Sequence, residues 1–218
     1  MLIGLLGAEK KCQSLLPSFS DRCKIIQIKD NHLNDFDLLV DLDFDEHQDF
    51  EIYEGLDEIP LVLASAKCSL REALFINQSK RKNKIFGINA LSGFLSFQKK
   101  EMSLLNKNDK DLLNDLMTNL GWQYEMVEDS VGMVSPRILY MIINEAFYTV
   151  QEGTASKEDI NMGMKLGTNY PFGPFEWVEK FGIKDVYETL ESLHEDTKEE
   201  RYKIAPLLKQ TYLQAEMV

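Results

Sequence analysis

Three cysteines are candidates for nucleophilic or metal chemistry in this chain: Cys12, Cys23 and Cys68. They are widely spaced and form no CxxC pair, so we expect neither a zinc site nor a disulfide framework. An odd number of unpaired cysteines is typical of a reducing compartment, and we therefore expect a cytoplasmic protein. A nucleophilic role for Cys68 would require a neighbouring histidine to take up the thiol proton, and the sequence places none close to it.

The chain has three histidines, His32, His47 and His194. His47 and His194 lie among acidic residues, where we expect solvated side chains. Imidazole is the side chain best suited to general base catalysis near neutral pH. General base catalysis by an imidazole in this chain would therefore have to use one of these three histidines.

A glycine, Gly7, follows the first apolar run, where a strand would turn into a helix. Dinucleotide-binding chains carry G-x-G-x-x-G there: the second glycine lets backbone amides approach the pyrophosphate, and the third allows close helix–strand packing. Glu9 and Cys12 occupy the second and third glycine positions here. Glu9 adds bulk and negative charge where the phosphates come closest, and Lys10 and Lys11 either offset that charge or form a solvated helix face.

Asp30 follows Gly7 by 23 residues and ends the second apolar run. An acidic residue at about this distance binds the adenine ribose in dinucleotide-binding domains. Its alternative interpretation is a turn residue before Asn31. Only about seven residues separate Asp30 from the next expected strand.

Short apolar runs separated by polar stretches dominate the first half of the chain. We expect strands at residues 2–6, 24–28, 37–41, 61–64 and 84–88, and another at residues 122–127 after a helix over 111–120. Continuous apolar strands of this kind argue for a parallel sheet covered on both faces. The pattern predicts a doubly wound, Rossmann-like α/β domain over residues 1–130.

The second half, residues 131–218, has helical periodicity and predicts an all-helical domain. Ser135 and Pro136 are expected to open a helix as N-cap and first helical residue, with Gly153 at its C-terminal end. A capping box starting at Ser156 opens a second helix that runs to Gly167. Three further helices are expected over residues 174–181, 183–195 and 205–215.

The composition limits the kinds of macromolecule that this chain is expected to bind. Hydrophobic residues make up 44% of the chain and charged residues 28%, which is ordinary for a globular protein. The formal net charge is −12, from 36 acidic and 24 basic residues. Nucleic acids and anionic membranes require a basic face, so we expect neither as a partner. No run approaches the roughly 18 apolar residues of a membrane span.

Three motifs of the helical half occur in the order and at the spacing found in one family. They are NEAF at residues 144–147, EGTASKEDIN at 152–161 and GTNYPFGPFEWVEKFGI at 167–183. This half resembles the C-terminal domain of the 3-hydroxyacyl-CoA dehydrogenases. The resemblance implies a homodimer, NAD as cofactor, a CoA-like or nucleotide ligand, and a place in fatty acid metabolism. In that family a long helical arm after the second strand also contributes to CoA binding. The short segment after Asp30 implies that this arm is missing here.

The resemblance extends weakly to two segments of the first half, ASAKCSL at residues 64–70 and FGINALSGF at 86–94. It implies that Asn89 stands at the position of the catalytic histidine and Glu101, twelve residues later, at that of its partner glutamate. Cys68 replaces a serine that hydrogen-bonds the substrate oxygen. Ser92 and Pro136 replace two asparagines.

An asparagine amide cannot take up the hydroxyl proton at neutral pH, so the family's general base is missing from its position. Three interpretations remain. The first is a dimeric binding or regulatory protein without dehydrogenase activity. The second is an active NAD-dependent oxidoreductase in which Glu101 serves as the base, although Glu101 is also interpretable as a surface acid beside two lysines. The third is an enzyme of another class that uses Cys68 as nucleophile.

Overall fold

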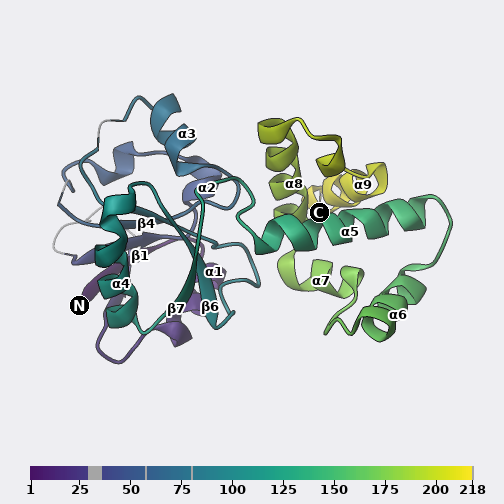
Figure 1. Cartoon of the computed structure of the whole chain (residues 1–218), viewed down its shortest axis with the longest axis horizontal. Helices are drawn as coiled ribbons and strands as arrows, with labels where there is room; N and C mark the ends of the chain where they lie inside the picture. The colour runs from purple at the N-terminus through teal and green to yellow at the C-terminus, as the bar shows by residue number, and fades with distance from the viewer. Residues whose placement is uncertain (29–35, 57, 80, 218) are drawn as a thin grey trace. The chain divides into compact units, whose positions relative to one another are not determined.

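The structure is a computed structural model that describes residues 1–28, 36–56, 58–79 and 81–217 (Figure 1). It divides into two compact units, Met1–Met133 and Val134–Val218. The first unit is built around a sheet, and the second contains helices and no strand among its described residues. The division falls three residues after the boundary expected from the sequence.

The sheet of the first unit has seven strands in the order β2-β1-β3-β4-β5-β6-β7. In chain order these are β1 (Leu2–Leu6), β2 (Lys24–Gln27), β3 (Leu38–Asp41), β4 (Leu61–Ala64), β5 (Ile85–Ile88), β6 (Lys99–Leu104) and β7 (Gln123–Val127). The first five strands are mutually parallel, β6 is antiparallel to β5, and β7 is parallel to β6. The prediction of an open, mostly parallel sheet is confirmed.

Strands β3, β4 and β5 are buried at every residue, as expected for parallel strands covered on both faces. Strand β6 was not predicted, because its sequence KKEMSL has no continuous apolar run. It pairs with β5 and β7 nevertheless, and it buries Lys100 and Met102 on one face. Lys100 and Glu101 are therefore strand residues and not a charged surface segment.

Four α-helices are described in the first unit: α1 (Glu9–Leu15), α2 (Phe44–His47), α3 (Leu70–Ile76) and α4 (Lys110–Leu120). Helix α4 buries its leucine stripe and ends at Gly121, whose φ of +77° provides a left-handed C-cap. The chain passes from β1 to β2 on one side and returns to β3 on the other side. The carboxyl ends of β1 and β3 therefore form the switch point at which open α/β sheets bind ligands.

The second unit contains α5 (Ser135–Gln151), α6 (Lys157–Thr168), α7 (Pro174–Phe181), α8 (Ile183–Thr197) and α9 (Pro206–Glu216) (Figure 1). Buried Asn144 of α5 accepts a hydrogen bond from the Ala205 amide at 2.8 Å and donates one to the Lys203 carbonyl at 2.8 Å. The asparagine of the NEAF motif thus fixes the segment that leads into α9.

The ends of α5 and α6 test three sequence predictions. Ser135 is the first helical residue and Val134 precedes it as N-cap, without a side-chain hydrogen bond, so the prediction of Ser135 as N-cap was wrong by one residue. Gly153 follows the helix with φ of +71°, as expected for a C-terminal glycine. The Ser156 cap of α6 is confirmed, because its hydroxyl accepts a hydrogen bond from the Asp159 amide at 3.1 Å.

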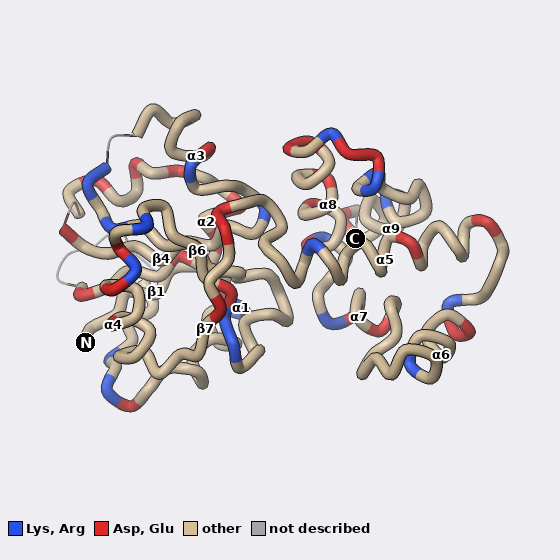
Figure 2. The backbone as a smooth tube through the Cα atoms, viewed as in Figure 1, with Lys and Arg blue, Asp and Glu red and all other residues tan. Residues whose placement is uncertain are grey.

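Basic residues are interspersed with acidic ones along both units, as Figure 2 shows. This distribution accompanies the net charge of −12 and gives no support to a phosphate-binding basic face. In the described ranges, no helix is both long enough and apolar enough to cross a bilayer.

Candidate functional site

The loop from β1 to α1 occupies the phosphate-binding position of a doubly wound sheet. Gly7 has φ of +133°, and a Cβ at this residue would come within 2.9 Å of the Leu42 Cβ. A glycine is therefore required here by both backbone conformation and close packing. Cys12 is fully buried and its thiol donates to the Gly7 carbonyl at 3.4 Å, so its side chain fills the space that a third glycine would leave open.

Asp43, just beyond the end of β3, places its carboxylate at the start of α1. It accepts a hydrogen bond from the Ala8 amide at 2.5 Å and forms an ion pair with Lys11 at 2.9 Å. Lys11 also donates to the Leu42 carbonyl at 2.8 Å. Lys11 is therefore largely buried and bonded, and the prediction of a solvated helix face was wrong for it, whereas Lys10 is exposed.

The contacts of Asp43 with Ala8 and Lys11 decide whether the phosphates of a dinucleotide fit against this loop. In a dinucleotide-binding domain the amides at the helix start point at the pyrophosphate. Here the Asp43 carboxylate already accepts the Ala8 amide and neutralises Lys11, so a pyrophosphate at the same place would meet a fixed negative charge. The residues present do not fit the phosphates of NAD. The predicted ribose-binding residue, Asp30, lies outside the described residues.

Next to this loop is a buried network that the sequence did not predict. Asp41, the last residue of β3, is 2% exposed and accepts hydrogen bonds from the Tyr53 hydroxyl at 2.7 Å and the Asp43 amide at 2.9 Å. The His47 Nε2 lies 3.2 Å from the same carboxylate, and the His47 Nδ1 accepts from the Asp49 amide at 3.0 Å. The prediction of an exposed His47 side chain holds, although both of its ring nitrogens lie within hydrogen-bonding distance of a partner.

These contacts change the pKa of the Asp41 carboxyl and that of the His47 imidazole. Burial by itself would raise the pKa of the Asp41 carboxyl, but hydrogen bonds from His47, Tyr53 and the Asp43 amide lower it overall. The hydrogen bond to Asp41 raises the pKa of His47 despite its partial burial. Because both ring nitrogens of His47 are engaged, its role here is to satisfy the buried carboxylate.

Asn89 and Glu101, the positions of the predicted histidine–glutamate pair, are brought together by pairing of β5 and β6. The Asn89 amide donates to the Glu101 carboxylate at 3.3 Å, and its carbonyl oxygen accepts from the Leu91 amide at 3.3 Å. Asn89 is buried and Glu101 is half-buried. The interpretation of Glu101 as a surface acid therefore holds only in part.

Cys68 follows β4 and is buried. Burial, and then the carboxylates of Asp45, Asp129 and Glu72, raise the pKa of its thiol far above the ordinary value. The thiolate is the nucleophilic form of cysteine, so this environment opposes its use as a nucleophile. The helix that follows Cys68 is closed at its N-terminus by Asp129, which accepts from the Leu70 amide at 2.8 Å and the Arg71 amide at 3.0 Å.

The remaining predicted positions lie on other elements. Ser92 is half-buried in the turn that follows β5. Pro136 is buried in the first turn of α5, in the second unit. His194, on α8, is half-buried with its Nδ1 3.2 Å from the Glu199 carbonyl, so the prediction of a solvated side chain holds only in part.

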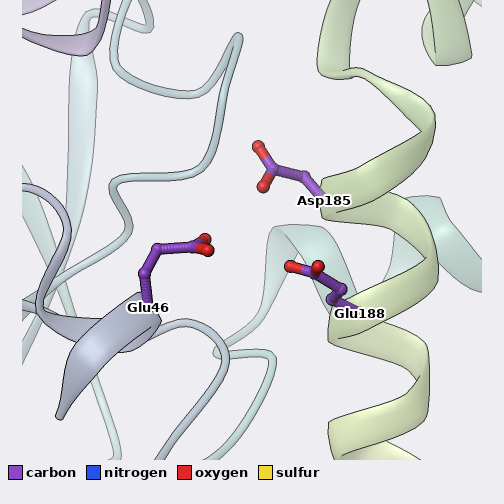
Figure 3. A group of neighbouring side chains, drawn as sticks. All are labelled: Glu46, Asp185 and Glu188. Atoms are coloured by element: carbon purple, nitrogen blue, oxygen red, sulfur yellow. The ribbon is translucent and has the colours of Figure 1, made fainter. Parts of the chain in front are cut away.

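Three carboxylates, those of Glu46, Asp185 and Glu188, are of the residue types that bind metal ions. Asp185 and Glu188 project from the same stretch of α8, one turn apart, and Figure 3 shows them together with Glu46. Glu46 belongs to the first unit, where it forms an ion pair with buried Lys67. Glu188 accepts from the Tyr212 hydroxyl at 3.3 Å. Each of these two glutamates thus has a partner within its own unit, and we assign no metal site to the group.

Known proteins match this chain over both halves. Residues 132–217 match the family described as 3-hydroxyacyl-CoA dehydrogenase, C-terminal domain. A 3-hydroxyadipyl-CoA dehydrogenase of Escherichia coli (strain K12) is 42% identical over 87 residues, which cover 40% of this chain and 18% of that protein. A 3-hydroxybutyryl-CoA dehydrogenase of Clostridioides difficile is 28% identical over 183 residues, which cover 81% of this chain and 65% of that protein.

The crystal structure of FadB2 from M. tuberculosis superposes with a TM-score of 0.80 at 16% identity and covers 98% of this chain and 93% of that one. The fold is that of a dehydrogenase with a Rossmann-like sheet and a helical C-terminal domain. The chain matches the C-terminal domain of the 3-hydroxyacyl-CoA dehydrogenase family over residues 132–217, and its sequence similarity to the relatives is strongest over this helical half. It spans less than two thirds of the length of the curated relatives described above.

Proposed function

We propose that this chain is a diverged 3-hydroxyacyl-CoA dehydrogenase homologue that lacks the dehydrogenase activity and acts as a dimeric binding or regulatory protein. The observation that carries the proposal is the pair of buried Asn89 and half-buried Glu101 at the positions of the family's histidine and glutamate, with the Asn89 amide nitrogen 3.3 Å from the Glu101 carboxylate. A carboxamide has no basic lone pair at neutral pH, so it cannot accept the proton that leaves the hydroxyl group during hydride transfer.

The dinucleotide loop supports the same proposal independently. Family resemblance implies NAD, but Glu9 and Cys12 replace two glycines and the Asp43 carboxylate lies against the start of α1. We therefore propose that NAD does not bind at useful concentrations. A CoA-like or nucleotide small molecule remains the proposed class of ligand for the diverged protein.

The alternative function is an active NAD-dependent oxidoreductase that uses Glu101 as its base. The observation in its favour is that Glu101 is half-buried at the catalytic position and lies within hydrogen-bonding distance of Asn89. Under this alternative, Glu101→Gln would abolish turnover, whereas the main proposal expects no turnover to lose.

The proposed dimer contacts belong to the helical half. Helix α6 has no buried residue, and its apolar side chains Met162 and Leu166 are 59% and 81% exposed within the unit. Large exposed apolar side chains that share a helix face favour contact with another surface. A cytoplasmic location is proposed from cysteine usage, since Cys12, Cys23 and Cys68 are all free thiols.

The test is an assay of NADH formation from 3-hydroxybutyryl-CoA and a longer-chain analogue, with NAD affinity measured by calorimetry on the same sample. We expect no turnover above the blank and no NAD binding in the micromolar range. Turnover near one per second, which lies at the low end of ordinary enzyme rates of about 1–10³ s⁻¹, would establish the alternative. Micromolar NAD affinity without turnover would overturn our interpretation of the dinucleotide loop and leave that of Asn89 intact.

A further inference from the structure

A cavity of about 420 Å³ lies in the first unit, away from the switch point. Its lining comes from three segments: residues 14–18 around the end of α1, residues 95–100 leading into β6, and residues 121–123 between α4 and β7. Lys100 lines this cavity, and Glu101 is its neighbour on the same strand. Because side chains alternate along a strand, Lys100 and Glu101 point to opposite faces of the sheet. The cavity is therefore separate from the family's catalytic position.

Lys100 is the unusual residue of this cavity, because its side chain is charged and only 4% of its surface is exposed. Its ammonium group donates to the backbone carbonyls of Leu95 and Phe97, the latter at 2.7 Å. An ammonium carries three N–H donors, so one remains. No carboxylate in the part of the chain that the structure describes pairs with it, and burial alone accounts for the lowered pKa of Lys100. The fold therefore buries a cation whose charge it does not neutralise, which is costly.

Trp122 supplies a second donor at the same cavity. It is 6% exposed, and its ring lies 5.0 Å from that of Phe19. Its indole Nε1 is buried and has no hydrogen-bond partner among the described residues. A buried indole N–H usually finds an acceptor. The lining thus holds two donor N–H groups without an acceptor in the described part of the chain, the Trp122 indole N–H and the third N–H of the Lys100 ammonium. Pro17, Leu95 and Phe97 provide an apolar surface beside them.

We propose that this cavity binds a small organic carboxylate. Its anionic oxygens accept from the Lys100 ammonium and the Trp122 indole N–H, and its apolar body packs against Leu95, Phe97 and Pro17. The carboxylate neutralises the buried cation and satisfies both donors. The volume lies within the range of about 300–1,000 Å³ that is usual for small-molecule sites. The apolar lining favours an organic acid over a bare inorganic anion.

The site shares none of the residues on which the proposed function rests. Gly7, Asp43, Asn89 and Glu101 do not line the cavity. Failure of the carboxylate site would therefore leave the proposed loss of dehydrogenase activity untouched, and the reverse also holds.

The first experiment uses benzoate as the probe and benzamide as its neutral counterpart of nearly the same shape. The chain has two tryptophans, so a Trp177→Phe variant leaves Trp122 as the only indole reporter. We expect saturable change in its fluorescence with benzoate at millimolar concentration and constant ionic strength. Benzamide should bind at least about tenfold more weakly because a charge-assisted hydrogen bond is lost. Calorimetry on the unaltered protein repeats the comparison without any substitution.

Matched variants then locate the site. Lys100→Met should weaken benzoate binding at least about tenfold, because it removes the charge and keeps the chain length. Lys99→Met removes the same charge one residue away on the exposed side and should leave the affinity within about twofold. If Lys100→Met fails to fold, Trp122→Phe tests the site by removing only the indole N–H, with calorimetry as the readout. It should weaken benzoate binding severalfold.

Several results would overturn the proposal. These are equal affinity for benzoate and benzamide, no benzoate binding at about 10 mM, and unchanged benzoate affinity in the folded Lys100→Met or Trp122→Phe protein. Inorganic phosphate serves as a further arm. Competition by phosphate as strong as that of benzoate would show a general anion site and would contradict the organic carboxylate as ligand.

Discussion

At the residue scale, Asn89 is satisfied where it stands. Its amide group donates to Glu101 and its carbonyl oxygen accepts from the Leu91 amide, so both ends of a buried polar side chain have partners. A buried polar group with partners on both sides is stable without any catalytic role. Under the proposed function, this pair keeps the twelve-residue spacing of the family's histidine and glutamate with an amide in place of the base.

The first prediction concerns Asn89→His, which restores the missing imidazole. We expect no NADH formation above the blank, because we propose that the loop at Gly7 does not bind NAD, independently of the base. A positioned general base contributes about 10²–10⁴-fold to rate, and this gain has no effect when NAD does not bind. The measurement is the dehydrogenase assay on Asn89→His beside the unaltered protein and Asn89→His/Glu101→Gln. Turnover that appears in the single variant and disappears in the double variant would contradict the prediction.

The second prediction concerns the pH dependence that His47 gives to stability. Its pKa in the folded protein is raised above the ordinary value of 6.5, chiefly by Asp41. Its contribution is therefore fully present below about pH 6.5 and is lost as the pH rises through the folded pKa. The free energy of unfolding of the unaltered protein should exceed that of His47→Gln by more at pH 5.5 than at pH 8.5, measured by urea denaturation.

An Asp41→Asn background provides the control for this comparison. With the carboxylate removed, the difference caused by His47→Gln should no longer depend on pH in this way. The hydrogen bond from the Asp49 amide to the His47 Nδ1 favours the neutral ring and opposes the effect of Asp41. A difference that widens as the pH rises would show that the neutral ring is the form the fold stabilises. The Asp41 carboxyl affects stability at acidic pH. Its pKa is lowered in the folded protein, so its contribution to the free energy of unfolding is lost only below about pH 3.8.

At the element scale, the start of α7 shows how a short motif fixes the packing of two helices. A Cβ at Gly173 would lie 2.4 Å from the Asn161 Cα, so α6 and α7 approach too closely for any side chain there. The side-chain Oδ1 of Asn161 accepts from the Phe175 backbone amide at 3.0 Å, and buried Phe175 packs on Phe147 with ring centroids 5.1 Å apart. The backbone φ of Gly173 is −76°, so the glycine is needed for space and not for its conformational freedom.

The third prediction follows from that contact. Gly173→Ala should lower the free energy of unfolding by about 1–3 kcal/mol, as expected when a well-packed contact is overfilled. Gly163→Ala is the matched control, because a Cβ at that position in α6 meets nothing within 4 Å. It should be neutral or stabilise by up to about 1 kcal/mol through helix propensity. Urea denaturation measures both, and equal effects of the two substitutions would show that the close approach is not needed.

At the scale of the whole molecule, the fourth prediction concerns assembly. We expect the chain of 25.1 kDa to sediment as a dimer at micromolar concentration. Leu166→Glu should shift it toward the monomer, because a charge would be placed on the exposed apolar face of α6. Phe75→Glu is the control: Phe75 is 82% exposed in the first unit, and its substitution should leave the dimer intact. A monomer in the unaltered protein would contradict the proposed assembly.

The sequence alone determined the class of fold and the order of most elements, although it missed β6. The five parallel strands, the long helix from Ser135 and the segment at Gly173–Phe175 depend on hydrophobic periodicity, end caps and small residues, which are local features of the chain. The replacements at Glu9, Cys12 and Asn89 were also visible in the sequence, because the residue type at a motif position can be read without coordinates.

Only the tertiary structure decided where the charged residues lie. A run such as KKEMSL predicts exposure, yet pairing of β6 with β5 and β7 buries Lys100 and sets Glu101 against Asn89. Likewise, the Asp43–Lys11 pair and the contacts of His47 and Tyr53 with Asp41 join residues that belong to different elements. Burial and partnership of a charged side chain depend on which segments meet in space, and local sequence patterns carry no information about that.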